Sequence, residues 1–188
     1  MSASAAVAGS TIIRAVSQAA EFSVLELLRN GRQIEIRGLR PSDREELLAA
    51  AERTSDRSLY RRFFSVRREF SDAEVTSFVN VDFIEQVALV AVVREDGGEI
   101  IAGGGRYIVV RPRMAELAFT VVDEFQGQGI ASALLRHLAA LARAAGLSEL
   151  IAEVMPDNTA MLRVLERSGL RLQKKRESGV VQVSLLLL

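Results

Sequence analysis

The sequence predicts a mixed α/β (α+β) protein with a central, mostly antiparallel sheet flanked by helices. Two observations support this fold class. Three β-rich segments separated by Gly and Pro turns follow one another between residues 86 and 122, as in an antiparallel meander. A strand, helix, strand, helix order then leads into a closing hairpin, so the sheet is expected to be mixed and to carry helices beside it.

Residues 1–30 are expected to form an N-terminal tail that contains a short helix. The first 20 residues are rich in Ala and Ser, which is typical of a mobile tail. Phe22, Leu25 and Leu28 are spaced three apart, which predicts an amphipathic helix within residues 21–29. The domain proper, residues 31–188, then begins with a strand over residues 32–40, where apolar and polar residues alternate.

Two helix starts follow that strand. Pro41 and Ser42 precede a first turn rich in acidic residues, where the helix dipole favours them. Ser71 and Glu74 have the spacing of a capping box, which predicts a second helix. Between them lies an arginine cluster interleaved with aromatic residues. It is interpreted as a solvated helix face, or alternatively as a docking surface for an acidic protein; its members are Arg57, Arg61, Arg62, Arg67 and Arg68.

The strands of the meander are expected at residues 86–93, 100–110 and 115–122. Asp96, Gly97 and Gly98 form the turn of a hairpin. Three consecutive glycines, 103–105, lie inside the second strand, and they predict a bulge or a close approach of the backbone.

The C-terminal third begins with a Gly-rich turn at residues 125–129. A helix follows, with an apolar stripe formed by Ile130, Leu134, Leu138, Leu141 and Ala145, and Gly146 ends it. A strand is expected at residues 150–155, a helix at 157–168, and a hairpin formed by 170–176 and 180–188.

Composition excludes several classes of function. Lys+Arg 24 and Asp+Glu 24 give a net charge of zero, which argues against a nucleic-acid or anionic-membrane binder. Because Cys is absent and His137 is the single histidine, disulfides, a thiolate nucleophile and a multi-histidine metal site are ruled out. No metal is therefore expected. With no signal peptide or membrane-spanning run in the sequence, a cytoplasmic location is expected.

The most informative segment is the Gly-rich turn between a strand and a helix, FQGQGIAS at residues 125–132. Its backbone N–H groups and the helix dipole together suit an anion such as a pyrophosphate. The segment is not a phosphate-binding loop of the Walker A type, because no Gly-Lys-Ser/Thr follows. A dinucleotide-binding fingerprint is also disfavoured, because the turn comes late in the chain with too few βα units after it.

Residues 126–131 fit the pattern Gln/Arg-x-x-Gly-x-Gly/Ala, and here the sequence resembles the GNAT superfamily of N-acetyltransferases. Asn158 followed by Gly169 and Leu170 resembles a second signature of the family. The similarity extends over residues 33–188. Residues 58–64 and 80–92 resemble the GNAT domain of bacterial Pat-type protein-lysine acetyltransferases, which modify acyl-CoA synthetases.

The resemblance implies a GNAT fold, acetyl-CoA as co-substrate and a cofactor site on both sides of the cleft. It also implies that the backbone of Phe119, Thr120 and Val121 pairs with the pantetheine arm of the cofactor. The implied pyrophosphate site consists of Gln126, Gly127, Gln128, Gly129, Ile130, Ala131 and Ser132, and Asn158 is implied to contact the CoA chain.

Glu116 resembles the strand glutamate that acts as general base in lysine acetyltransferases of this superfamily. The alternative is an ordinary strand carboxylate that faces solvent, since alternation does not decide which face is the cleft. Leu165 stands where many relatives have a tyrosine that protonates the leaving thiolate. No residue is therefore assigned as general acid.

The predicted function is transfer of the acetyl group of acetyl-CoA to a primary amine in a ternary complex. A protein lysine, for example on an acyl-CoA synthetase, is the favoured acceptor. Two alternatives stay open: acetylation of a small amine or antibiotic, and a catalytically silent domain that senses acyl-CoA.

Overall fold

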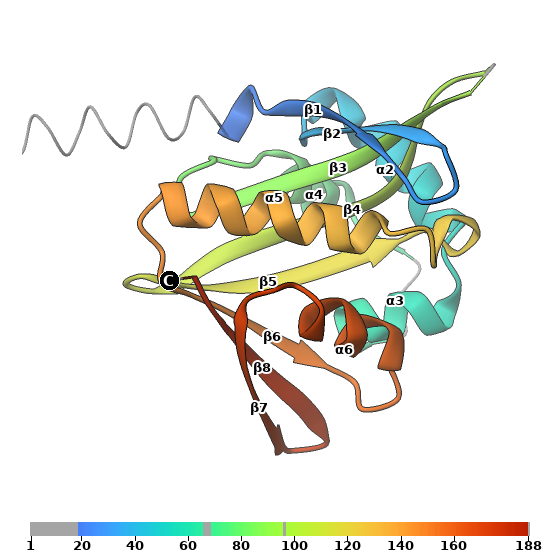
Figure 1. Cartoon of the computed structure of the whole chain (residues 1–188). Helices are drawn as coiled ribbons and strands as arrows, with labels where there is room; N and C mark the ends of the chain where they lie inside the picture. The colour runs from blue at the N-terminus through green and yellow to red at the C-terminus, as the bar shows by residue number, and fades with distance from the viewer. Residues whose placement is uncertain (1–18, 66–68, 96, 188) are drawn as a thin grey trace, which may run out of the picture.

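The computed structural model describes residues 19–65, 69–95 and 97–187. Within these residues, eight strands form one sheet in the order β1-β2-β3-β4-β5-β6-β8-β7. Figure 1 shows α5 crossing one face of the sheet, with α2 and α4 behind the opposite face and α3 and α6 beside the open ends of β5 and β6. The predicted fold class, a mixed and mostly antiparallel sheet between helices, is confirmed.

The strands and helices have the following bounds. The strands are β1 Ser23–Leu27, β2 Gln33–Gly38, β3 Gln86–Glu95, β4 Gly98–Arg111, β5 Met114–Val121, β6 Glu149–Val154, β7 Arg171–Glu177 and β8 Val180–Leu186. The helices are α2 Arg44–Glu52, α3 Asp56–Phe63, α4 Asp72–Val79, α5 Ile130–Ala144 and α6 Thr159–Glu166, and a short 3-10 turn, Pro41–Asp43, leads into α2.

The sheet is antiparallel except at one point. Strands β1 to β5 pair in sequence as an antiparallel meander, and β8 pairs antiparallel with both β6 and β7. The exception is β5 with β6, which are parallel and joined by α5. That connection needs a crossover helix because both strands run in the same direction.

The three glycines in β4 permit close packing under α5. A Cβ atom at Gly105 would lie 2.6 Å from the Phe119 ring, and one at Gly103 would lie 2.9 Å from the carbonyl oxygen of Thr120. A register irregularity occurs at Ala91, the partner of Gly103 on β3. The predicted bulge and close approach are therefore both present.

Helix α5 packs its apolar face on the sheet and forms the centre of the core. Ile130, Leu134 and Leu138, predicted as part of its apolar stripe, are almost completely buried. Gly146 takes a positive φ of 83° just after the helix, as its predicted capping role requires. The rigid unit of sheet and helix fixes the position of the turn that precedes α5.

The helix predicted within residues 21–29 is wrong, because this segment forms strand β1. Five residues of β1 pair with β2. Phe22 and Leu28 flank the strand, so their spacing of six residues reflects two separate contacts with the core and not a helical face. Leu25, between them, points to solvent and is 61% exposed. Backbone pairing along the free edge of β2 outweighs the weak helical pattern.

Helix α6 is shorter than the predicted range 157–168. It begins at Thr159, because Asn158 is the N-cap, whose side-chain oxygen accepts a hydrogen bond from the Met161 amide at 3.2 Å. The capping box of α4 is present as predicted, with the Ser71 side chain accepting from the Glu74 amide and the Glu74 carboxylate accepting from the Ser71 amide. Arg67 and Arg68 of the predicted arginine cluster lie outside the described residues.

A buried ion pair fixes the start of α2 against β2. Arg37 donates to both carboxylate oxygens of Asp43, at 2.7 and 2.8 Å, and the Arg40 amide donates to the same carboxylate at 2.8 Å. Both side chains are more than nine-tenths buried. Burial alone would raise the pKa of Asp43, but these hydrogen bonds outweigh it and hold the pKa below its usual value.

We expect Asp43→Asn to lower the free energy of unfolding by about 3 kcal/mol at pH 7, because it leaves the Arg37 charge buried without a partner. The pKa of Asp43 is lower in the folded than in the unfolded chain, so its contribution is complete above about pH 4 and is lost as the pH falls below that value. Urea unfolding at pH 7 and at pH 3 measures both effects. The control, Asp72→Asn, breaks an exposed pair with Arg44 and should cost at most about 1 kcal/mol. Equal losses in the two variants would contradict the prediction.

Candidate active site

A cleft opens where β5 and β6 separate. The two strands pair over only three residue pairs, the last being Glu116 with Ile151. Beyond this point they diverge, as Figure 1 shows between the labels β5 and β6. The cleft has a volume of about 940 Å³ and is lined by residues of β5, β6, α3, α5, α6 and the turn before α5. The unpaired edge of β5 along the cleft can accept an extended ligand as an additional strand.

The predicted anion site lies at one end of this cleft. Gly127 and Gly129 have positive φ values of 74° and 100°, and Gly129 is the N-cap of α5. The first backbone bond of the helix runs from the Ala133 amide to the Gly129 carbonyl, so the amides of residues 130–132 have no acceptor within the helix. Free amides at the positive end of a 15-residue helix fit a phosphate group.

The two glutamines of the turn hold its shape. The Gln126 side-chain amide donates to the Val121 carbonyl at 3.0 Å and to the Ser58 hydroxyl at 3.1 Å. The Gln128 amide donates to the Glu124 carbonyl at 3.0 Å. Their side chains thus tie the turn to its surroundings, and the turn itself lines the cleft. A Cβ at Gly127 or Gly129 would meet no atom within 4 Å, so the left-handed backbone, not a lack of room, requires glycine there.

All the predicted cofactor residues line one cleft. Phe119, Thr120 and Val121 form its β5 wall, residues 126–132 form its floor near α5, and Asn158 lies across from them at the start of α6. The Asn158 side-chain oxygen caps α6, and this bond orients its amide group. The sequence pattern therefore identified residues from three separate elements that the fold brings together.

Helix α3 spans the cleft and is bonded to both of its sides. On the α5 side, the Ser55 amide donates to the Asp123 carboxylate at 3.2 Å, and Ser58 accepts from Gln126. On the α6 side, Arg61 donates to the Asp157 carboxylate at 2.7 Å. Hydrogen bonds from Arg61 and Arg57 lower the pKa of Asp157. Arg57 and Arg61 thus both bind Asp157, while the Arg57 side chain stays 71% exposed, so the docking surface stays a prediction.

Glu116 lies at the apex of the cleft, on the face of β5 that α3 covers. Its side chain is exposed, and it lines the cleft together with Arg62 of α3. Burial lowers the pKa of Arg62, and the nearby charge of Glu116 acts in the opposite direction. Glu116 thus lines the cleft and is exposed to solvent as well, and its role as general base stays a prediction.

Sequence reasoning missed the cations that line the cleft. One lies shortly after β1, two lie on α5, one lies on α6 and one directly follows α6, and no shared motif links them. Positive charge at these places adds to the helix dipole in attracting a phosphorylated ligand. The residues are Arg29, Arg136, Arg143, Arg163 and Arg167.

No tyrosine lies among the described residues that line the cleft. Leu165, at the position of the usual tyrosine, is completely buried. Tyr107 is also buried, and burial raises its pKa to about 12. Tyr60 lies on α3 outside the cleft lining.

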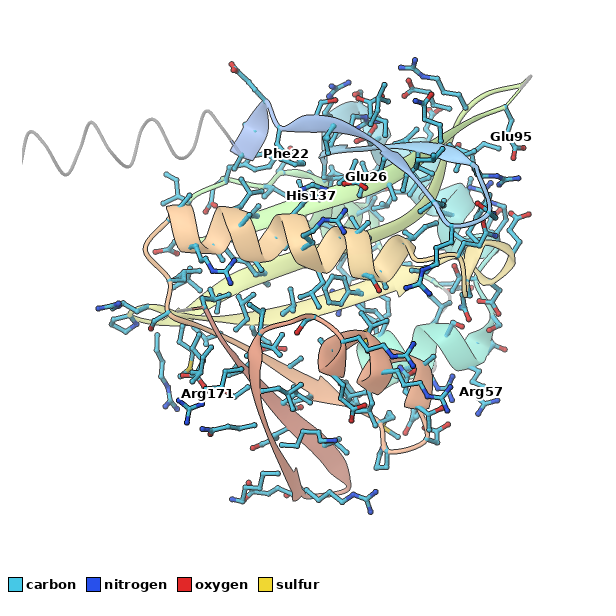
Figure 2. The ribbon with its side chains drawn as sticks, viewed as in Figure 1. Phe22, Glu26, Arg57, Glu95, His137 and Arg171 are labelled. Carbon is cyan, nitrogen blue, oxygen red and sulfur yellow. The ribbon has the colours of Figure 1, made fainter. Side chains whose placement is uncertain are left out.

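His137 makes contacts that hold two elements of the fold together. Its Nε2 atom lies 2.6 Å from the Glu26 carboxylate, and its ring packs on Phe22 with the centroids 5.1 Å apart. Figure 2 shows these three side chains between the N-terminal strand and α5. Arg136 donates to the same carboxylate at 2.6 Å. The cluster fastens β1 to α5 beside the cleft.

Among the described residues, no group of three or more His, Asp or Glu side chains is placed to hold a metal ion. Nor does any helix there combine the length and the apolar character that crossing a bilayer requires.

Comparison with known proteins agrees with this geometry. The Acetyltransferase (GNAT) domain family matches residues 33–171. The GNAT domain of S. lividans PAT is 34% identical, with a TM-score of 0.79, and the match covers 87% of this chain and 96% of that chain. The acetyltransferase PA5475 of Pseudomonas aeruginosa is 33% identical over 138 residues, 73% of this chain and 74% of that protein.

The acetyltransferase Pat of Mycolicibacterium smegmatis is also 33% identical, over 144 residues. The match covers 76% of this chain but only 42% of that protein. The separated strands β5 and β6, the glycine turn before α5 and the matched family all lead to the same assignment: the chain belongs to the GNAT family of acetyltransferases.

Proposed function

We propose that this protein transfers the acetyl group of acetyl-CoA to the amine of a protein lysine, with Glu116 as general base. One observation carries the proposal: Glu116 lies where β5 and β6 separate, in the same cleft as the free amides before α5. A donor with its pyrophosphate on those amides and its pantetheine arm along residues 119–121 would bring its thioester toward this carboxylate. Phe119, Thr120, Val121, residues 126–132 and Asn158 are the proposed donor site.

A base is needed because a lysine amine is mostly protonated at neutral pH. With a pKa of about 10.4, only roughly 1 in 2,500 amines is neutral at pH 7, and only the neutral form attacks a thioester. Glu116 accepts the amine proton, directly or through water. The Arg62 guanidinium in the same cleft disfavours a second positive charge there and so favours the neutral amine.

The surroundings of Glu116 support a protein acceptor over a small amine. Its carboxylate is exposed, and its partner on β4, Ile108, is 38% exposed. Phe64, at the end of α3, lines the same cleft and is 39% exposed. An acceptor residue can thus reach Glu116 from an open surface that carries apolar side chains, which suits a protein partner such as an acyl-CoA synthetase. A small amine would be expected to require a closed pocket.

Labelled acetyl-CoA tests this function directly. The protein is incubated with a lysate of its own organism, with a purified acyl-CoA synthetase and with spermidine, and the labelled atoms are located by mass spectrometry. We expect label on lysine side chains, and none in samples that contain Glu116→Gln in place of the native protein. Label on spermidine alone would favour the small-amine alternative, and binding of acetyl-CoA without any transfer would favour the sensor.

A further inference from the structure

A second cavity lies on the face of the sheet that α2, α3 and α4 cover. It has a volume of about 250 Å³. Its walls are largely apolar, with Leu47, Phe70 and Phe78 among them, and these three side chains are only half-buried. Apolar side chains that remain partly accessible inside a molecule indicate room for an apolar ligand.

The second cavity adjoins the active-site cleft. Arg62, Phe63, Ala118 and Thr120 line both spaces. Ala118 and Thr120 follow Glu116 at intervals of two residues on β5, so all three face the same side of the sheet. The boundary between the two spaces therefore lies close to the carboxylate to which the proposed function assigns the amine proton.

Two guanidinium groups lie in the wall of this cavity. Arg106 is the register partner of Ala118 on β4, and its guanidinium lies 3.8 Å from the centre of the Phe78 ring. One Arg106 nitrogen donates to the Phe78 carbonyl at 2.7 Å. Arg62, the second cation, lies over the Phe63 ring, 4.8 Å from its centre, and the charge of Glu116 in the adjoining cleft acts on it.

Among the described residues, Arg106 has no carboxylate beside it in the cavity, and the acidic group near Arg62 is Glu116, which lies in the cleft. Burial, with a further contribution from the charge of Arg62, lowers the pKa of Arg106 to about 10. Glu74 is the one carboxylate in the described wall; it is exposed and accepts hydrogen bonds from Ser71 in the capping box of α4. A buried Arg106 beside a half-buried Arg62 is an unfavourable arrangement of like charges, and a negatively charged ligand in the cavity would relieve it.

Of the groups that the acyl-CoA donor and the lysine acceptor bring to the site, the acyl group is the one that fits the second cavity. A lysine acceptor carries a positive charge, and its amine must stop near Glu116, so the two cations would repel it from the cavity. The acyl chain, in contrast, extends from the thioester carbon away from pantetheine. Ala118 and Thr120 offer it a small, partly apolar passage into the second cavity.

We propose that the second cavity receives the acyl group of an acyl-CoA whose chain ends in a carboxylate, such as glutaryl or succinyl. The apolar walls surround the methylene groups, and the terminal carboxylate binds Arg62 and Arg106. This inference rests on the proposed function, because it assumes that the thioester lies near Glu116. In transfer, the amine nitrogen forms a bond with the thioester carbon, the carbon–sulfur bond breaks, Glu116 takes the amine proton and CoA leaves as the thiolate. The terminal carboxylate is unchanged.

Calorimetry on the whole protein, with no acceptor present, tests the inference by comparing glutaryl-CoA with pentanoyl-CoA and acetyl-CoA. Pentanoyl has the same number of carbons as glutaryl but no charge. We expect glutaryl-CoA to bind roughly ten- to a hundredfold more tightly than pentanoyl-CoA, as a charge-assisted hydrogen bond allows. In Arg106→Met this preference should fall at least fivefold, and acetyl-CoA should bind as before.

A second variant tests the cavity without removing a charge. A Cβ at Gly104 would make only ordinary contacts, 3.4 Å from the Leu89 carbonyl oxygen and 3.9 Å from Val90. Gly104→Val should therefore fold, fill part of the second cavity and weaken both five-carbon donors at least tenfold, while acetyl-CoA binding is retained. Melting temperatures of both variants show whether they are folded.

Three results would overturn the inference: equal affinity for glutaryl-CoA and pentanoyl-CoA, a preference that survives in Arg106→Met, or no effect of Gly104→Val. Free glutarate, added to the protein with CoA, distinguishes the source of the carboxylate. If glutarate binds with the same dependence on Arg106 and glutaryl-CoA shows no preference, the cavity holds a free acid and not an acyl group. Because these are binding measurements, failure of acyl transfer would refute the proposed function separately.

Discussion

The variant Glu116→Gln is expected to lower kcat by 10²- to 10⁴-fold at neutral pH, the range typical of a lost general base. Glutamine has almost the same size as glutamate and should leave strand β5 intact, but it cannot take the amine proton. Raising the pH should partly restore the rate, because more of the acceptor amine is then already neutral. The affinity for acetyl-CoA should stay almost unchanged, since the proposed donor contacts are mainly backbone groups elsewhere. Initial rates between pH 6 and 9 measure both effects.

A matched control exists in the same cleft. Glu153 is an exposed strand carboxylate on β6 that also lines the cleft, but it lies beyond the point where the strands separate. Glu153→Gln should keep a rate within a few-fold of the unsubstituted protein. If Glu116→Gln has the unsubstituted rate across this pH range, or if both variants lose the same activity, Glu116 is not the base.

The variant Gly129→Asp is expected to weaken acetyl-CoA binding by at least about a hundredfold. Its carboxylate would lie at the N-terminus of α5, where it competes for the same amides and repels the pyrophosphate. Loss of two or more charge-assisted bonds is enough for an effect of this size. For the unsubstituted protein, acetyl-CoA at about 100 times its Kd should stabilise the fold by roughly 2.7 kcal/mol. Thermal melting with and without acetyl-CoA should show this stabilisation only in the unsubstituted protein.

Gly179→Asp serves as the control for backbone strain. Gly179 has a φ of 82° in the turn between β7 and β8, and a Cβ there would also meet no atom within 4 Å. It should lose some stability but keep the full shift with acetyl-CoA. Equal stabilisation of the unsubstituted protein by NAD or ATP, with none by CoA, would contradict the acetyltransferase assignment itself.

The strands and the main helices were predictable because their signals are local. The alternation of Ile34 and Ile36, the capping box of Ser71 and Glu74, and the glycines around α5 depend only on neighbouring residues. The error at β1 has a physical cause: an edge strand needs little apolar alternation of its own, because backbone pairing with β2 and the contact of Glu26 with His137 hold it.

The candidate site was predictable only as a set of residue types. The motif identified the turn before α5, but the separation of β5 from β6 just after Glu116 depends on register, which no local pattern specifies. The arginine cluster shows the same limit. Arg61 and Arg62 are adjacent in sequence, yet Arg61 binds Asp157 and Arg62 lies between two cavities.

The bonds that attach α3 to the rest of the protein decide how easily this helix opens on its own. The described hydrogen bonds that join α3 to the loops on the two sides of the cleft involve its side chains or the Ser55 amide at its N-terminus. None of them is a backbone bond of the sheet. Exposed pairs of this kind are individually weak, so we expect α3 to open locally at these bonds while the core stays folded, with the buried side chain of Leu59 as its main remaining anchor. Amide hydrogen exchange in α3 is then governed by local opening and not by global unfolding. A donor that bridges both loops suppresses this opening, so protection of α3 should rise with donor occupancy.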